Sequence, residues 1–130
     1  MFALDTNTVI YFFKGLGRVG DRLLFTRPSE IAIPAVILFE LENGIAQSSS
    51  PGKRRSQLDT FLGAVTILPF DKVAAQAAAH TDAALRKTGK AIGPMDTLIA
   101  GIALAHDATL VTHNTSEFRR VRGLRVEDWY

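Results

Sequence analysis

Cysteine is absent from this chain of 130 residues. A disulfide framework and a zinc site built from thiolates are therefore both excluded. No apolar run approaches the roughly 18 residues that a membrane-spanning helix needs. The apolar opening of the chain is interrupted by Asp5 and has no basic residues before it, so it does not resemble a signal peptide. We therefore expect a soluble cytoplasmic protein that has no contact with a membrane.

An excess of charge of either sign is also missing. The chain has 15 basic and 13 acidic residues, a net charge of +2, and 47% of its residues are hydrophobic. This balance is typical of a globular protein, and the length fits one domain with a real core. Basic residues gather near the end of the chain, at Arg119, Arg120, Arg122 and Arg125. Such a cluster suits a polyanionic partner, although a solvated loop explains it equally well.

Strand-like and helix-like segments alternate along the chain. Short apolar segments with strand character occupy residues 2–4, 30–33, 65–68, 109–111 and 124–127. Segments with helical character occupy residues 9–14, 21–25, 34–46, 56–62 and 71–87, and a further helix has Pro94 in its first turn. This alternation predicts a three-layer α/β/α sandwich with a mainly parallel central sheet.

Two helix starts are predicted from capping chemistry. Thr6 or Asn7 can cap the first helix, because hydroxyl and amide oxygens accept from the free N–H groups of a first turn. Pro34 is expected as the first residue of the third helix, where its missing N–H costs nothing.

Polar residues follow two of the predicted strands. Asp5 comes directly after the first strand, and Thr112 to Asn114 follow the strand at residues 109–111. Open α/β sheets bind ligands at the carboxyl ends of their strands, so we expect Asp5 and Asn114 to face one crevice. Asp96 lies in the first turn of the helix that begins near Pro94, beside the positive end of the helix dipole. It is expected to close another side of the same crevice.

A third carboxylate comes from the apolar helix of residues 34–46, which contains Glu40 and Glu42. A buried carboxylate is costly unless it is paired, hydrogen-bonded or coordinating a metal. The two glutamates are two positions apart and point to different sides of the helix. Periodicity alone does not decide which of them turns inward.

Several carboxylates in one pocket repel one another, and a cation relieves that repulsion. Oxygen ligands without cysteine or paired histidine favour Mg²⁺ or Mn²⁺ over zinc. One or two such ions lower the pKa of a bound water and stabilise both oxygens of an in-line phosphodiester displacement. This chemistry requires no serine, cysteine or histidine nucleophile.

Four short motifs occur in order along the chain. They are LDTN (Leu4–Asn7), FELENG (Phe39–Gly44), the helix start at Asp96–Ala100, and LVTHNTSEF (Leu110–Phe118). Together they resemble the PIN-domain ribonucleases, and specifically the VapC toxins of bacterial toxin–antitoxin pairs. The closing segment GLRVEDW (Gly123–Trp129) is also similar to the end of one VapC subgroup.

The resemblance implies a Mg²⁺-dependent endoribonuclease formed by a single PIN domain at residues 1–130. Asp5, Glu40 and Asp96 would be its metal-binding carboxylates, a choice that selects Glu40 over Glu42. Thr6 and Thr112 would be the hydroxyls that support these ligands.

A fourth acidic position departs from the family pattern. Many PIN domains have an aspartate after the last core strand, where this chain has Asn114, with Glu117 three residues further on. Asn114 could hold a ligand or water through its amide oxygen, and Glu117 could supply the missing charge. The choice between them, and between one metal ion and two, stays open.

The resemblance also implies partners. An RNA substrate, preferably a tRNA, would be held through its phosphates by Arg119, Arg120 and Arg122. A VapB-type antitoxin would block the pocket, operator DNA would be bound only through the antitoxin complex, and a homodimer is expected. The apolar residues at 11–13 and 23–25 are a candidate docking groove for the antitoxin. The alternative is a PIN fold kept as an RNA- or protein-binding module with weak catalysis, a hypothesis supported by Asn114.

Overall fold

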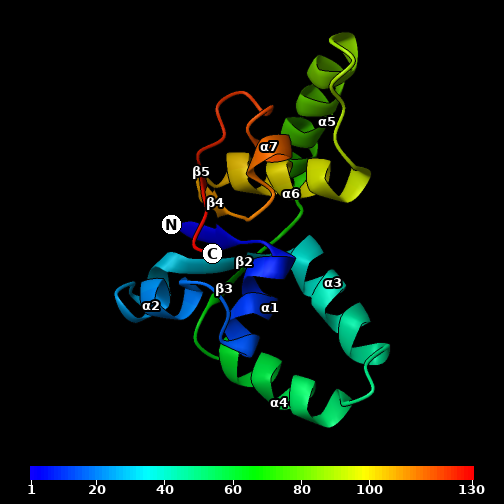
Figure 1. The fold of residues 1–130 in the computed structure, drawn as a ribbon. Coiled ribbons are helices and arrows are strands. Elements are labelled where there is room, and N and C mark those ends of the chain that lie inside the picture. The colour runs from blue at the N-terminus through cyan, green and yellow to red at the C-terminus, as the bar shows by residue number, and fades with distance from the viewer.

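The computed structural model describes all 130 residues, which form a five-stranded sheet between two groups of helices (Figure 1). The strands are β1 (Phe2–Leu4), β2 (Ile31–Pro34), β3 (Thr66–Leu68), β4 (Thr109–Val111) and β5 (Val126–Glu127). Their order in the sheet is β3-β2-β1-β4-β5, and every pairing is parallel. The predicted α/β class with a parallel central sheet is confirmed.

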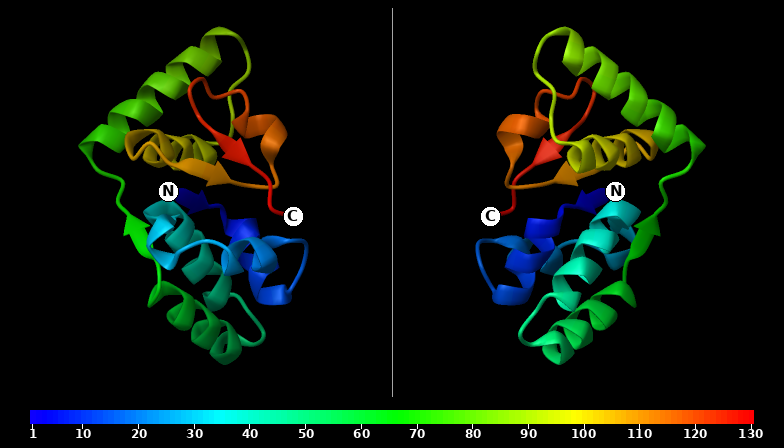
Figure 2. Two further views of the ribbon diagram at one scale, coloured as in Figure 1. Left: turned by 90° about the vertical axis from the view of Figure 1, so that its left-hand side faces the viewer. Right: turned by 90° about the vertical axis from the view of Figure 1, so that its right-hand side faces the viewer.

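The helices are α1 (Thr6–Lys14), α2 (Val19–Leu24), α3 (Ala35–Ala46), α4 (Pro51–Leu62), α5 (Lys72–Lys87), α6 (Pro94–Ala105) and α7 (Thr115–Phe118), with a 3₁₀ turn at Pro28–Glu30. Figure 2 shows α1 to α4 on one side of the sheet and α5 and α6 on the other, which gives the expected three layers. None of the helices combines the length and hydropathy that crossing a membrane requires.

The start of α1 differs from the prediction. The helix begins at Thr6 rather than Val9, and its N-cap is Asp5 rather than Thr6 or Asn7. The Asp5 side chain accepts the Thr6 N–H at 2.8 Å. Aspartate is as good an N-cap as asparagine and a better one than threonine. Asp5, which was expected only as a ligand, therefore also ends the strand and starts the helix.

Three further boundaries were predicted wrongly. Pro34 is the last residue of β2 instead of the first of α3, because its backbone angles (φ −57°, ψ 142°) are extended. The helix expected from Ser56 begins at Pro51, where the proline suits a first turn. The strand expected over residues 124–127 is limited to Val126–Glu127, and the short helix α7 was not predicted at all.

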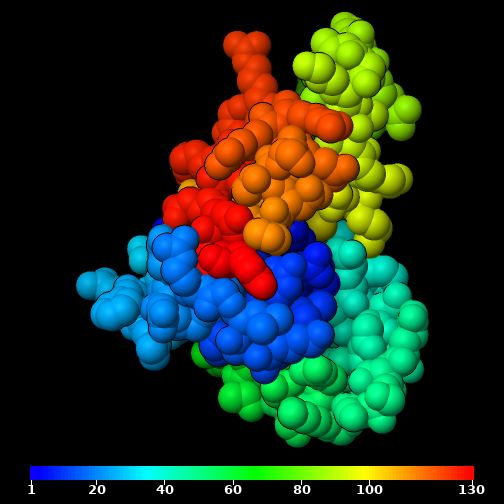
Figure 3. Space-filling view, viewed as in Figure 1, coloured from blue at the N-terminus to red at the C-terminus, as the bar shows by residue number.

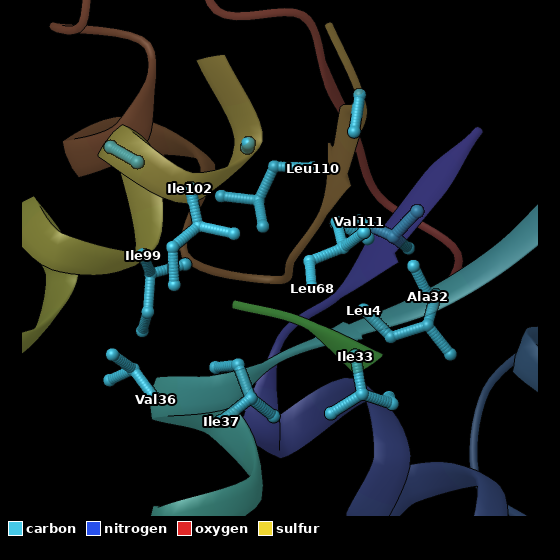
Figure 4. Packing of buried hydrophobic residues seen from close by; sticks show 14 of the residues in the cluster. Leu4, Ala32, Ile33, Val36, Ile37, Leu68, Ile99, Ile102, Leu110 and Val111 are labelled. Carbon is cyan, nitrogen blue, oxygen red and sulfur yellow. The ribbon is translucent and has the colours of Figure 1, made fainter. Parts of the chain in front are cut away.

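The core lies between the sheet and its helices. Figure 4 shows aliphatic side chains of the strands packed against those of α3 and α6. Leu4, Ile33 and Leu110 have no exposed surface. Because helices cover both faces of the sheet, the strands are apolar at consecutive positions, as parallel strands usually are.

The sheet reverses its direction of growth at β1. The chain moves from β1 to β2 and β3, and then returns through α5 and α6 to place β4 on the other side of β1. The helices that follow β1 and β4 therefore leave toward opposite faces of the sheet (Figure 2). Such a switch point opens a crevice between the carboxyl ends of the two strands. The Asp5 N–H donates to the Val111 carbonyl at 2.9 Å and keeps these ends together.

Close packing of α5 on α6 depends on Gly101. A Cβ added at Gly101 would lie 2.6 Å from the Ala78 Cβ and 2.7 Å from the Ala74 carbonyl oxygen. These atoms belong to a rigid neighbouring helix, so any side chain at this position forces the helices apart. The spacing between α5 and α6 matters for the crevice because Asp96 lies in the first turn of the same helix as Gly101.

Gly101→Ala is expected to destabilise the protein by about 1 to 3 kcal/mol, the usual cost of overpacking a core. Gly44→Ala is the matched control, since nothing lies within 4 Å of its added Cβ. That control should be neutral or stabilising by up to about 1 kcal/mol, because alanine favours a helix. Urea unfolding of the two variants measures both effects. Equal changes in stability would contradict the close α5–α6 contact.

Candidate metal centre

Asp5 is the most firmly held carboxylate of the crevice. Its Oδ1 accepts the Thr6 N–H at 2.8 Å, and its Oδ2 accepts the Thr112 hydroxyl at 2.7 Å. Burial raises the pKa of Asp5, and the hydrogen bonds from Thr112 and Thr6 lower the pKa in part. These neutral donors fix the orientation of the carboxylate without neutralising its charge.

Glu40 reaches the same place from α3. Its Oε1 accepts the Thr6 hydroxyl at 3.0 Å, so Thr6 donates to Asp5 through its N–H and to Glu40 through its side chain. Glu42 lies on another side of α3, where its Oε1 accepts from Arg55 of α4 at 3.0 Å. The hydrogen bonds from Arg55 lower the pKa of Glu42. The structure therefore places Glu40, and not Glu42, beside Asp5.

Asp96 enters the crevice from the first turn of α6. Burial, the contact with the Glu117 carboxyl and the charges of Asp5, Glu117 and Glu40 together raise the pKa of Asp96 to about 7, with burial as the largest cause. A like charge has this effect only when it is close. The four carboxyl groups therefore gather at one crevice, although they come from the N-cap of α1 and from α3, α6 and α7.

Glu117 and Asn114 have different places in the site. The Asn114 N–H donates to the Thr112 hydroxyl at 3.0 Å, and the Asn114 side-chain amide donates to Glu117 Oε2 at 2.8 Å. Glu117 in turn contacts the carboxyl of Asp96. Glu117 thus supplies the fourth carboxyl group, while Asn114 holds it. The unpredicted helix α7 produces this arrangement, because it folds Glu117 back toward the crevice.

Buried threonines connect the strand ends that carry the site. Thr112 has no exposed surface; it donates to Asp5 and accepts from the Asn114 N–H. Thr8, for which no role is predicted, is also buried, and its hydroxyl donates to the Val111 carbonyl at 3.1 Å. Its position one turn beyond the strand end, on the buried face of α1, is the signal that could have identified it.

The carboxylates of the crevice have no basic partner. The ion pairs of the structure involve other acidic residues, namely Glu42, Asp59, Asp82, Asp107, Glu127 and Asp128. The four carboxyls do not form a closed cage either, since no three ligating side chains are close enough to enclose a metal. Mg²⁺ usually keeps several waters and is held by one or two carboxylates. This open set of oxygen donors therefore fits a hydrated Mg²⁺ or Mn²⁺ ion.

The predicted RNA-binding arginines lie on and after the end of α7. Arg119 and Arg122 are exposed, while Arg120 lies 3.5 Å from the Ala91 carbonyl oxygen. Arg125 is already occupied, because it forms an ion pair with Asp107 at 3.0 Å. Arg119 and Arg122 are the arginines of this cluster that have no protein partner.

A model of the PIN domain matches residues 2–124 of the chain. The protein belongs to the PIN-domain family. A Shigella flexneri protein named tRNA(fMet)-specific endonuclease VapC is 34% identical over 128 residues, which is 98% of this chain and 97% of that protein. Ribonuclease VapC2 of Rickettsia felis is also 34% identical, over 131 residues, with coverage of 99% and 98%.

Solved PIN-domain structures give the same result. The structure of VapBC2 from Rickettsia felis bound to a DNA fragment from their promoter has a TM-score of 0.92 and 33% identity, with 99% of this chain and 98% of that chain covered. DNA-bound VapBC from Salmonella typhimurium has a TM-score of 0.92 and 32% identity, with the same coverage. The predicted PIN-like fold and the resemblance to VapC ribonucleases are confirmed, and so is the enzyme class, a nuclease that hydrolyses RNA.

The raised pKa of Asp96 predicts that the carboxylate cluster lowers the stability of the folded protein as the pH rises. Its pKa of about 7 lies above its ordinary value of 3.8, so the folded PIN domain binds this proton more tightly than the unfolded chain. The associated stability is complete below about pH 4 and is lost as the pH rises through 7. Asp96→Asn should therefore raise the Tm of the protein in EDTA at pH 8 by a few degrees, about 1 kcal/mol after solvent screening, and by less at pH 5.

Calorimetry at both pH values, with and without Mg²⁺, measures this effect. Saturating Mg²⁺ should remove the advantage of the variant, because the cation relieves the same repulsion in the unmodified protein. Glu42→Gln is the control and should give no gain at pH 8, since it loses the ion pair with Arg55. An equal change in Tm at pH 5 and pH 8 for Asp96→Asn would contradict the carboxylate cluster.

Proposed function

We propose that this protein is a VapC-type toxin, a Mg²⁺- or Mn²⁺-dependent endoribonuclease whose substrate is a tRNA. The convergence of four carboxyl groups without a basic partner, at the crevice between β1 and β4, is the observation that carries this proposal. The family match and the names of the similar ribonucleases support it. The whole chain, residues 1–130, would act as one PIN domain.

Each carboxylate has a distinct part in this proposal. Asp5 and Asp96 are the principal ligands of the cation, and Glu117 adds negative charge beside Asp96. When bound, the cation lowers the pKa of a water and stabilises the attacking and leaving oxygens of an in-line displacement. Glu40 Oε1 accepts from Thr6, so the other oxygen, Oε2, is free to orient the attacking water and accept its proton.

The support for a tRNA substrate is of two kinds. The relative from Shigella flexneri is named as a tRNA(fMet)-specific endonuclease. The exposed guanidinium groups of Arg119 and Arg122, helped by Arg120, provide positive charge for backbone phosphates next to α7, the helix that carries Glu117. A tRNA substrate would place the action of the toxin in the cytoplasm.

A VapB-type antitoxin is the proposed partner, with operator DNA bound only through the complex. The two solved structures compared above are VapBC complexes, and both contain DNA. A cavity of about 200 Å³ between α1, α3 and α4 is lined by Ile10, Phe13 and Glu40, among others. A segment docked there would cover Glu40 and block the site. Phe12 and Phe13 are half-buried and pack against Phe61, so this part of the predicted docking groove is only partly open to a partner.

The exposed apolar residues suggest where further contacts lie. Leu24 and Phe25 are 82% and 91% exposed, which leaves residues 23–25 of the predicted docking groove open to a partner. Phe39 of α3 and Val73 of α5 are also exposed. We propose these two as contacts of the expected homodimer.

The alternative of a non-catalytic binding module rests on Asn114 in place of an acidic residue. Glu117 supplies a carboxyl group at that position, and Asn114 holds it there. No feature of the site therefore favours the binding module over the nuclease.

Cleavage of a labelled tRNA pool by the purified protein in Mg²⁺ tests the proposed function. Discrete fragments are expected, and EDTA should abolish them. Asp5→Asn and Glu40→Gln should each reduce the cleavage rate by about 100-fold or more, because they remove a ligand and the proton acceptor. Glu42→Gln is the matched control on the same helix and should stay within about twofold of the unmodified rate, a ratio that corresponds to only about 0.4 kcal/mol.

Equal losses in the Glu40 and Glu42 variants would contradict the assignment of Glu40. A pool left intact by protein that has been freed of antitoxin would count against the nuclease. Retention of the intact RNA in a gel would then favour the binding module.

A further inference from the structure

Three rings form a cluster beside the carboxylates that the proposed chemistry does not use. The centroids of His113 and Tyr130 are 4.6 Å apart with the rings inclined by 34°, close to a stacked arrangement. Tyr11 of α1 lies edge-on to both, at 4.7 Å from Tyr130 and 5.9 Å from His113. On the face shown in Figure 3, the C-terminal segment (red) meets α1 (blue) and the segment after β4 (orange).

Backbone connections place this cluster next to the proposed catalytic site. His113 lies between Thr112 and Asn114 in the sequence. Thr112 donates to Asp5, and Asn114 donates to Glu117. Neighbouring Cα atoms are about 3.8 Å apart, so the His113 backbone lies directly between the two residues that hold these carboxylates.

The rings are held in position by the chain around them. Asp128 Oδ2 lies 2.9 Å from His113 Nδ1, and Asp128 Oδ1 accepts the Tyr130 N–H at 3.0 Å. Gly17 has a φ of +63°, and a Cβ there would lie 2.8 Å from main-chain atoms of Tyr130. Glycine is therefore required where this loop supports Tyr130. A surface fixed in this way loses little conformational entropy when it binds a ligand.

The cluster is open to solvent on its outer side. Tyr130 is 45% exposed, and the His113 side chain is 48% exposed. Arg18 places a guanidinium group beside the rings, with its Nε donating to the Tyr130 carbonyl at 3.4 Å. Partly exposed aromatic rings next to a cation are typical of sites that stack single-stranded nucleic acid and hold its backbone. The charged edges formed by Arg18 and Asp128 make the surface a poorer match for an apolar protein segment.

We propose that Tyr11, His113 and Tyr130 form a stacking platform for one unpaired base of the RNA, next to the phosphate that is cleaved. This inference rests on the proposed ribonuclease function. His113 and Tyr130 provide the face that receives the base, Tyr11 buttresses them from its edge, and Arg18 contacts the flanking phosphate. A base within a duplex is already stacked and paired, so the platform selects single-stranded loops over helical stems.

Fluorescence of 2-aminopurine, which falls when this base stacks, provides the test. The probe is a single-stranded RNA oligonucleotide with 2-aminopurine, bound in Mg²⁺ by protein carrying Asp5→Asn to prevent cleavage. Quenching is expected with this protein and with the added Tyr130→Phe change. Tyr130→Leu should remove most of the quenching and weaken Kd by about tenfold, in line with the loss of one base–ring contact.

A second pair of variants guards against a local folding defect in Tyr130→Leu. His113→Phe keeps a ring and should retain quenching, whereas His113→Leu should lose it. In protein with Asp5 intact, both leucine variants should raise KM for the oligonucleotide while kcat stays within a few-fold. A fall in kcat alone would overturn the platform, because the rings would then act on the chemical step.

Two further outcomes would overturn the platform. Unchanged quenching and Kd in both leucine variants would show that the base stacks elsewhere, and the nuclease function would stand if the unmodified protein still cleaves RNA in Mg²⁺. Weakened binding of the antitoxin alone, with RNA binding unchanged, would assign the rings to the protein partner. Failure of the unmodified protein to bind or cleave any RNA would remove the proposed function and the platform together.

Discussion

Mutual repulsion among the carboxylates gathered at the crevice between β1 and β4 is the constraint on which the rest of the structure depends. Burial is the largest cause of the raised pKa of Asp96, and like charges at short range also disfavour its ionisation, which brings the pKa to about 7. The groups that hold the carboxylates are neutral: two threonine hydroxyls, one backbone N–H and one side-chain amide. Neutral donors fix direction without removing charge, so the negative charge of the cluster is preserved.

The fold provides the positions that such a site requires. Reversal of the strand order at β1 separates the helices after β1 and β4 and opens the crevice between them. Asp5 caps α1 and Asp96 lies in the first turn of α6, so both are near the positive ends of helix dipoles. That placement offsets part of the repulsion, and the tight contact at Gly101 fixes α6 against α5.

Local signals in the sequence predict part of this candidate site, and the rest depends on contacts between distant elements. Asp5 and Asp96 were predictable because a strand end and a proline-marked helix start are local signals. Glu40 could not be separated from Glu42 by periodicity, since α3 is apolar on most sides. What distinguishes them is Arg55, which reaches Glu42 from another helix. The four-residue helix α7 is too short to show a period, so the relation between Asn114 and Glu117 was also out of reach.

The location of a bound Mn²⁺ ion is the measurement that tests the central claim most directly. Anomalous diffraction from crystals grown with Mn²⁺ would show the ion without reference to any activity. The account predicts one strong peak in contact with the carboxylates of Asp5 and Asp96, on the side that Glu117 faces, and no peak there in an Asp96→Asn crystal. Protein that cleaves RNA in Mn²⁺ but shows no peak between β1 and β4 would contradict the assignment of the site.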